Sequence, residues 1–212
     1  AFYWYGLCHL EGIEGFWIDI EKAIFYLESA AELGDLKSKV TLADIYMGFN
    51  PNVTEDFYDF EKGCSLLENI STMVDNNSEK SYANYQLAKI YCREIYNKKN
   101  STKALECMKI ARELFSEEAE CLYAYWLWAG ILVEKNANEA INVLEKLIDK
   151  HVEEEFSYEY RDSLYLYGYM LYHGEGIDKN DKKAVIYLQK ASELGHTLAS
   201  VWLDDIQDDQ SN

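Results

Sequence analysis

Residues 163–199 read SLYLYGYMLYHGEGIDKNDKKAVIYLQKASELGHTLA, the pattern of a helix, a glycine-containing turn, a second helix and a glycine stop. In the first half, small and apolar residues recur three and four positions apart and so share one helix face. The second half carries a similar apolar stripe. These two stripes are Ser163, Tyr167, Gly168 and Leu171, and Ala184, Tyr187, Leu188, Ala191 and Leu194. Neither helix can bury its stripe alone, so the segment predicts a hairpin that packs against neighbours.

Glycines and one aspartate mark the ends of these helices. Gly174 and Gly176 predict a tight reversal with positive φ angles, which glycine adopts without steric cost. Asp181 is the expected N-cap of the second helix, and Gly195 is the expected stop. Gly168 has no side chain, so another helix can approach it closely.

The first 34 residues repeat this pattern, and three weaker copies lie between the two clear ones. The matched pairs are Gly6 and Gly168, Gly12 and Gly174, Ala23 and Ala184, and Gly34 and Gly195. The weaker copies show Leu42-Ala43, Leu87-Ala88 and Tyr123-Ala124 in their first helices, and Lys62-Gly63, Lys103-Ala104 and Glu139-Ala140 in their second helices. The chain is therefore built from internal repeats.

This pattern resembles the Sel-one-like repeat family, relatives of the tetratricopeptide repeats with a motif near AxxxLGxxYxxGxG…KAxxYxxKAxxxG. The second-helix anchors at 62, 103, 139 and 183 stand roughly 36 to 44 residues apart, wider than the tetratricopeptide period of about 34. The resemblance implies an all-α, right-handed α–α superhelix (a solenoid) of about five helix-pair repeats plus a C-terminal capping helix. It also implies a scaffold that binds other proteins, the usual role of such repeats.

We expect one solenoid domain over residues 1–212. The expected repeats are about 1–34, 35–75, 79–116, 117–160 and 161–195, with a capping helix at 196–209 whose charged end covers the stack. The second helix of repeat 2 is expected from Phe57. An acidic insertion containing Glu153-Glu154-Glu155 lengthens repeat 4.

The chain is strongly acidic, with a formal net charge of −18 in 212 residues. This charge disfavours binding to nucleic acid and to anionic membrane surfaces. No apolar run reaches the roughly 18 residues of a membrane span, so membrane insertion is not expected. Two readings stay open: the charge keeps the protein soluble, or it steers a basic protein partner.

The cysteines and histidines suggest neither a disulfide framework nor catalysis. Five cysteines stand without CxxC spacing, which indicates free thiols in a reducing, cytoplasmic location. HExxH, GxSxG and Walker motifs are absent, and the four histidines are scattered. We therefore expect no enzyme activity, no cofactor and no metal. The cysteines are Cys8, Cys64, Cys92, Cys107 and Cys121.

The candidate binding residues are those that the repeat pattern leaves free on the first helix of each repeat. Counted from the small Gly or Ala, positions −2 and +1 vary, and they are polar in the middle repeats and apolar from the fourth repeat onward. If first helices line the concave side, these positions form a protein-binding stripe. The candidates are Trp4, Leu7, Asp44, Lys89, Leu122, Tyr125, Leu166, Tyr169 and Trp202.

The apolar residues of this stripe can also be explained by packing alone. Packing under a neighbouring helix would equally explain why Leu122, Leu166 and Trp202 are apolar. A preceding repeat that covers them would explain Trp4 and Leu7. For function we expect a non-catalytic scaffold or adaptor that binds a partner protein, which could be basic, through its concave face. The alternatives are an immunity-type protein that neutralises a basic toxin or nuclease, and a fragment of a larger repeat adaptor in protein quality control.

Overall fold

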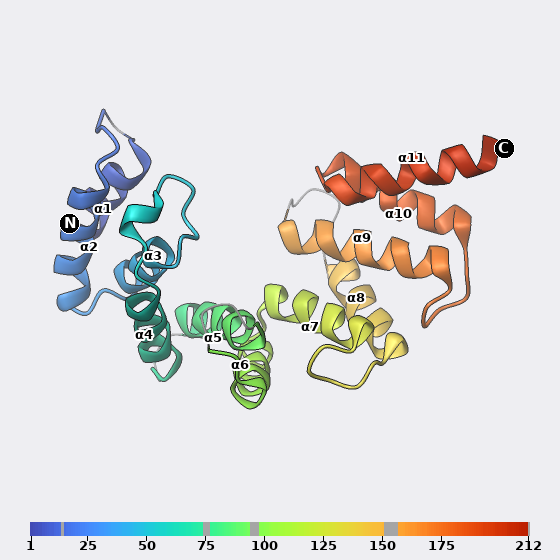
Figure 1. Cartoon of the computed structure of the whole chain (residues 1–212), viewed down its shortest axis with the longest axis horizontal. Helices are drawn as coiled ribbons and strands as arrows, with labels where there is room; N and C mark the ends of the chain where they lie inside the picture. The colour runs from blue at the N-terminus through green and yellow to red at the C-terminus, as the bar shows by residue number, and fades with distance from the viewer. Residues whose placement is uncertain (14, 74–76, 94–97, 151–156, 212) are drawn as a thin grey trace. The chain divides into compact units, whose positions relative to one another are not determined.

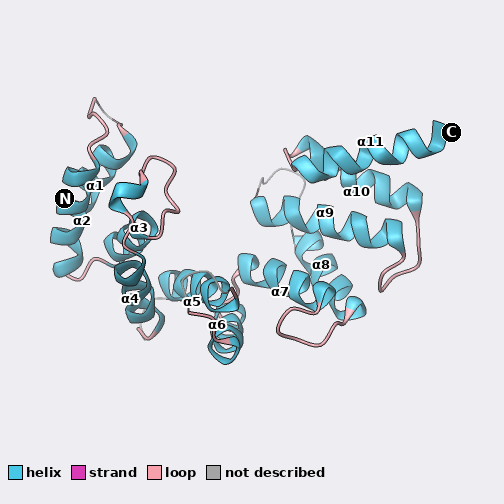
Figure 2. Ribbon diagram, viewed as in Figure 1, coloured by secondary structure: helices cyan, strands magenta, loops and turns pink. Residues whose placement is uncertain are grey.

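The computed structural model describes residues 1–13, 15–73, 77–93, 98–150 and 157–211, with the side chains of 207–211 left out. In these ranges all regular secondary structure is helical: eleven α-helices, one short 3₁₀ helix and no strand (Figure 2). The chain divides into two compact units, an N-terminal unit of Ala1–Leu114 and a C-terminal unit of Phe115–Asn212. The expected insertion at Glu153-Glu154-Glu155 lies outside the described residues.

The N-terminal unit contains three helix pairs, and each pair is one predicted repeat (Figure 1). The 3₁₀ helix Glu55–Phe57 lies in the loop of the second pair. The pairs are α1 (Phe2–Glu11) with α2 (Ile20–Glu32), α3 (Leu36–Tyr46) with α4 (Phe60–Ser71), and α5 (Asn77–Cys92) with α6 (Ser101–Glu113).

The C-terminal unit contains two further pairs and a final helix. These are α7 (Glu117–Ala129) with α8 (Ala137–Lys150), α9 (Tyr158–His173) with α10 (Asp181–Glu193), and α11 (Thr197–Ser211). The predicted all-α helical-repeat fold is confirmed, with five helix pairs and a C-terminal helix among the described residues. A single continuous domain over 1–212 stays a prediction.

Within each pair, the two helices cross where both carry a small residue. A Cβ atom added to Gly6 would lie 2.7 Å from Cγ of Leu27 in α2, and one added to Gly168 would lie 3.0 Å from Cγ of Leu188 in α10. Both positions are also close to a backbone oxygen of the partner helix. Even a methyl group would be too close to the partner helix at these two positions. The pairs of small residues are Gly6 and Ala23, Ala43 and Gly63, Ala88 and Ala104, Ala124 and Ala140, and Gly168 and Ala184.

An Asp or Asn begins every second helix, four residues before the small residue. Its side chain accepts a hydrogen bond from the backbone N–H three residues on, and its own N–H donates to a carbonyl near the end of the first helix. One residue therefore caps the second helix and ties it to the first. The five cap residues are Asp19, Asp59, Asn100, Asn136 and Asn180, and the carbonyls belong to His9, Tyr46, Tyr91, Leu127 and Leu171.

These caps correct two expectations about helix starts. The N-cap of α10 is Asn180 and not Asp181, because the Asn180 side chain accepts from the N–H of Lys183. Helix α4 starts at Phe60 and not at Phe57, because Asp59 caps it. The expected positive φ angles are confirmed at Gly174 (70°) and Gly176 (74°).

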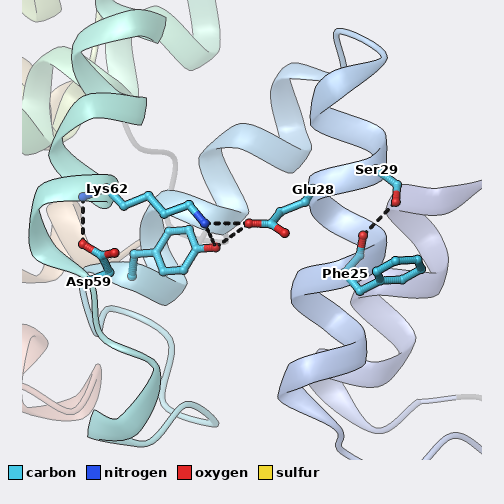
Figure 3. A network of polar contacts seen from close by, with 6 residues as sticks. Phe25, Glu28, Ser29, Asp59 and Lys62 are labelled. Carbon is cyan, nitrogen blue, oxygen red and sulfur yellow. Dashed lines mark hydrogen bonds and ion pairs between the residues drawn. The ribbon is translucent and has the colours of Figure 1, made fainter.

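Within each unit, successive repeats are joined by a buried tyrosine and a glutamate. In α2 the Glu28 carboxylate accepts from the Tyr46 hydroxyl of α3 at 2.9 Å, and Lys62 of α4 reaches the same carboxylate at 2.6 Å (Figure 3). Tyr91 bonds Glu68 of α4 in the same way, and Tyr167 of α9 bonds Glu145 of α8 at 2.9 Å. All three glutamates stand five residues after the small residue of their helix.

We expect Gly168→Leu to destabilise the fold by about 1–3 kcal/mol, because the new side chain overpacks the crossing of α9 with α10. Thermal melts followed by circular dichroism measure this. The control is Gln189→Leu, which adds a leucine at an exposed position of α10 and should change the melting temperature little. Equal melting temperatures for Gly168→Leu and the parent would contradict the tight crossing.

All five cysteines are free in the structure, and burial raises the pKa of Cys64 to about 11 and that of Cys121 to about 12. Only a small fraction of such thiols is ionised near pH 8. They react slowly because the thiolate is the reactive form. We expect slow iodoacetamide labelling of the native protein and five adducts after denaturation without reductant, counted by intact mass. Fewer than five adducts after denaturation would show a disulfide.

Candidate protein-binding face

The first helices of the C-terminal unit bring eight rings into one cluster of contacts. They come from α7, from α9, from α11 and from the residue just before α11. We call this group the aromatic cluster; it comprises Tyr125, Trp128, Tyr165, Tyr169, Tyr172, His173, His196 and Trp202.

A chain of ring contacts crosses all three helices. The centroid of Tyr125 lies 5.6 Å from that of Trp128, which lies 5.4 Å from that of Tyr169, which in turn lies 5.2 Å from that of Trp202. The last two contacts are edge-to-face, a geometry that aromatic pairs prefer. Tyr125 is 43% exposed, while Trp128, Tyr169 and Trp202 are partly buried. The cluster therefore presents aromatic surface on side chains that already support one another.

Polar contacts hold two of the rings in place. The indole N–H of Trp128 donates to the Glu175 carboxylate in the loop after α9. His196 stacks on Tyr165 at 4.1 Å, and its Nδ1 accepts from the backbone N–H of Ala199 at the start of α11. Burial lowers the pKa of His196, which favours the neutral imidazole that this hydrogen bond requires.

The structure places the predicted residues of this unit in three settings. Tyr125, Tyr169 and Trp202 belong to the aromatic cluster. Leu122 is partly buried. Leu166 is only 6% exposed and packs in the hydrophobic core with α7, α8 and α10, so the expected exposed stripe does not extend to it.

Sequence reasoning missed five members of the cluster. Trp128 and Tyr172 both stand at position +4, one turn beyond Tyr125 and Tyr169, so a stripe extended by one turn would have found them. Tyr165 stands at −3, a position that the repeat pattern does not mark as variable. His173 and His196 lie in or beside the ends of helices, where the repeat pattern gives no signal.

In the N-terminal unit, the predicted residues do not form one apolar patch. Trp4 is 64% exposed, while Leu7 is partly buried and packs against the core of α1, α2 and α3. The Lys89 ammonium lies 4.9 Å from the centroid of the Tyr85 ring. Asp44 lies near Lys89 on the neighbouring first helix. Asp44 and Lys89 therefore give the middle repeats the polar surface that the sequence predicts.

Asp44 is a carboxylate with too few partners for its burial. It accepts a hydrogen bond from the Tyr82 hydroxyl at 2.6 Å, across from α5 to α3. Burial nevertheless raises the pKa of Asp44 to about 6, although Tyr82 and Lys89 both favour the ionised form. At neutral pH the folded chain therefore holds a charge that the unfolded chain would hold more easily.

Neither a metal site nor a membrane span is found in the described residues. No group of three or more His, Cys, Asp or Glu side chains is arranged to hold a metal ion in that part of the chain. No helix there is long and apolar enough to cross a bilayer.

Paired helices that repeat along the chain, with aromatic surface on their first helices, define a helical-repeat protein. A model of the Sel1 repeat matches residues 1–35, 81–114, 117–150 and 161–196, more than half of the chain. The protein belongs to the Sel1 repeat family. Members of this family are generally non-catalytic and typically serve as scaffolds for protein–protein interactions. No curated protein matches the sequence.

Solved structures have the same fold at low sequence identity. A Sel1 repeat protein from Oxalobacter formigenes is 17% identical and superposes with a TM-score of 0.78, covering 97% of this chain and 74% of that one. A protective antigen of uropathogenic Escherichia coli with an SLR fold is 19% identical, with a TM-score of 0.76, covering 99% of this chain and 41% of that one. At these identities the likeness shows the fold alone.

We expect Asp44→Asn to stabilise the protein by about 1–3 kcal/mol at pH 7–8, because a neutral amide accepts from Tyr82 without the cost of a buried charge. The raised pKa means that Asp44 is protonated in the folded state below about pH 6. The gain should therefore fall as the pH is lowered from 6 to 4 and vanish below 4. Urea unfolding across this range measures it. A gain that does not change with pH would contradict the raised pKa.

Proposed function

We propose that this protein is a non-catalytic scaffold that binds a basic segment of a partner protein through the aromatic cluster of its C-terminal unit. The observation that carries the proposal is the cluster itself. Most of its rings lie on three successive first helices, and together they present aromatic surface. Of the two tyrosines predicted to bind, Tyr125 and Tyr169, Tyr125 is the more exposed. Tyr and Trp are the residues that most often dominate protein interfaces.

The charge of the C-terminal unit favours a basic occupant. This unit has 20 Asp and Glu residues against 8 Lys and Arg residues, a formal charge of −12. Glu175 and Asp162 lie beside the cluster but already face Lys135 and Arg161, so the net charge of the unit, and not these two carboxylates, favours a basic occupant. Lysine and arginine side chains gain from such a field and also bind to the faces of aromatic rings.

The rings and the charges should act on different rate constants. An acidic field attracts a basic partner before contact and so raises the association rate, an effect that salt weakens. Aromatic anchors are buried only in the complex, so they slow dissociation. This difference separates the contribution of the aromatic cluster from a general attraction between opposite charges.

We expect a random peptide display library, selected against the whole chain, to yield peptides rich in Lys and Arg that depend on the aromatic cluster. Tyr125→Ala and Tyr169→Ala should raise the dissociation rate of a selected peptide about tenfold, since each removes a ring worth about 1–2 kcal/mol. Higher salt should lower its association rate. Surface plasmon resonance at two salt concentrations measures both.

The matched control is Ile186→Ala, which removes an exposed apolar side chain from α10, a second helix of the same unit. It should leave both rates unchanged. Circular dichroism melts check that each tyrosine variant is folded. Peptides that bind the parent and the two folded tyrosine variants equally well would rule out the aromatic cluster as the binding face.

A further inference from the structure

A second group of aromatic rings lies on α1, α2 and the loop between them, in the N-terminal unit. Its central ring is Tyr26 of α2, whose centroid lies 5.6 Å from that of Tyr5 and 5.4 Å from that of Phe25. Two further rings contact Tyr26 and Tyr5, and the next residue of the loop adds a tryptophan. We call this group the outer face; it comprises Phe2, Tyr5, Phe16, Trp17, Phe25 and Tyr26.

The outer face points away from the other helices of its unit. Helices α3 and α4 lie on one side of the first pair (Figure 1). On that side Leu7 of α1 and Ile24 of α2 pack against the core that these helices share with α3. Each stands two residues from a ring of the outer face, Tyr5 or Tyr26, and residues two apart lie on nearly opposite sides of a helix. The rings therefore face solvent.

The exposed rings offer enough surface for a specific interface. Trp17 is 89% exposed, Phe25 is 63% exposed, and Phe2 and Tyr5 are each nearly half exposed. At about 200 Å² for a whole aromatic side chain, these four rings leave about 500 Å² open to solvent. Two copies placed face to face would bury about 1,000 Å² from these rings alone, the size at which a specific interface begins.

The equivalent positions join successive helix pairs elsewhere in the chain. Tyr5 stands one residue before the small residue of its helix, the position of Tyr167, which bonds a glutamate of the preceding pair. His9 stands three residues after it, the position of Tyr46, which also bonds a glutamate of the preceding pair. In the first pair this side is open, since Tyr5 is 49% exposed. The outer face thus suits an occupant that is itself a helix pair.

The local charge favours a second copy of this chain over a basic partner. Residues 1–10 contain no Asp, Glu, Lys or Arg, although the whole chain has a formal net charge of −18. On α2, Glu21 and Lys22 are exposed and of opposite sign, and Lys22 pairs with Asp19 at 2.8 Å. Interface cores are poor in charged residues and rich in aromatic ones. A basic segment gains little at this face, whereas two copies meet there with little local repulsion.

We propose that this chain forms a two-fold symmetric dimer in which the outer face of one copy packs on the outer face of the other. A two-fold contact uses the same patch on both copies, so the patch must be complementary to itself. Aromatic rings meet this condition because they pack against one another edge-to-face or offset. The assembly closes at two copies, because each copy has one such face. The contact lies in the N-terminal unit and does not depend on the aromatic cluster.

Sedimentation equilibrium of the whole chain over a wide range of concentration tests this proposal. We expect the average mass to rise from 24.7 kDa toward twice that value, with a dimer Kd on the order of 10 µM. Trp17→Ser and Phe25→Glu should each weaken the dimer about tenfold or more, because each removes an exposed ring from both copies. Added salt should strengthen the dimer, since it screens the repulsion between two acidic chains.

The matched control is Ile186→Glu, which introduces the same charge at an exposed apolar position of α10, a second helix of the C-terminal unit. It should leave the dimer Kd unchanged. Equal weakening by Phe25→Glu and Ile186→Glu would mean that net charge alone governs association, and would overturn the proposal. A chain that stays monomeric would also overturn it and leave the outer face to a different protein. Masses beyond the dimer would contradict a closed two-fold contact. Circular dichroism melts confirm that the variants are folded.

Discussion

The close crossing of two small residues in each helix pair is the constraint on which the rest of the structure depends. At Gly6 and Gly168 even a methyl group would meet the side chain and backbone of the partner helix. The small residues allow the helices to approach, and the Asp or Asn cap fixes where the second helix starts. Loops of different length can join the pair because the cap bonds to the first helix directly and not through the loop. The pairing of the two helices therefore tolerates loops of different length.

The crossing also determines which residues are left for binding. Small residues and their apolar neighbours face the partner helix, and the Tyr–Glu bonds occupy the contact between successive repeats. Position +1 and, in the C-terminal unit, position +4 of the first helices are less constrained by this packing, whereas Leu166 at −2 lies in the core. The C-terminal unit uses them for rings such as Tyr125 and Tyr169, and the N-terminal unit for polar groups such as Asp44 and Lys89. One fold thus presents two surfaces of different chemical character.

Much of this arrangement could be read from the sequence, and part of the rest was missed for identifiable reasons. Gly168 and Ala184 located the last repeat because only small residues fit a close crossing. The caps were also readable, since an Asp or Asn always stands four residues before the small residue. In the last repeat Asn180 and Asp181 are adjacent and both residue types cap helices, so the wrong one was predicted. The exposure of Leu166 was not readable. A leucine on a variable position looks the same whether it faces solvent or a neighbouring helix.

By itself the sequence determined the helical-repeat fold, because small-residue spacing and turn glycines act within one hairpin of about 35 residues. It also determined the acidic charge, which is a sum over residues. Only the tertiary structure decided which rings meet, since Trp128, Tyr169 and Trp202 come from three different repeats. It likewise decided that Leu166 is buried. Burial depends on every group in the neighbourhood, and repeat periodicity carries no information about it.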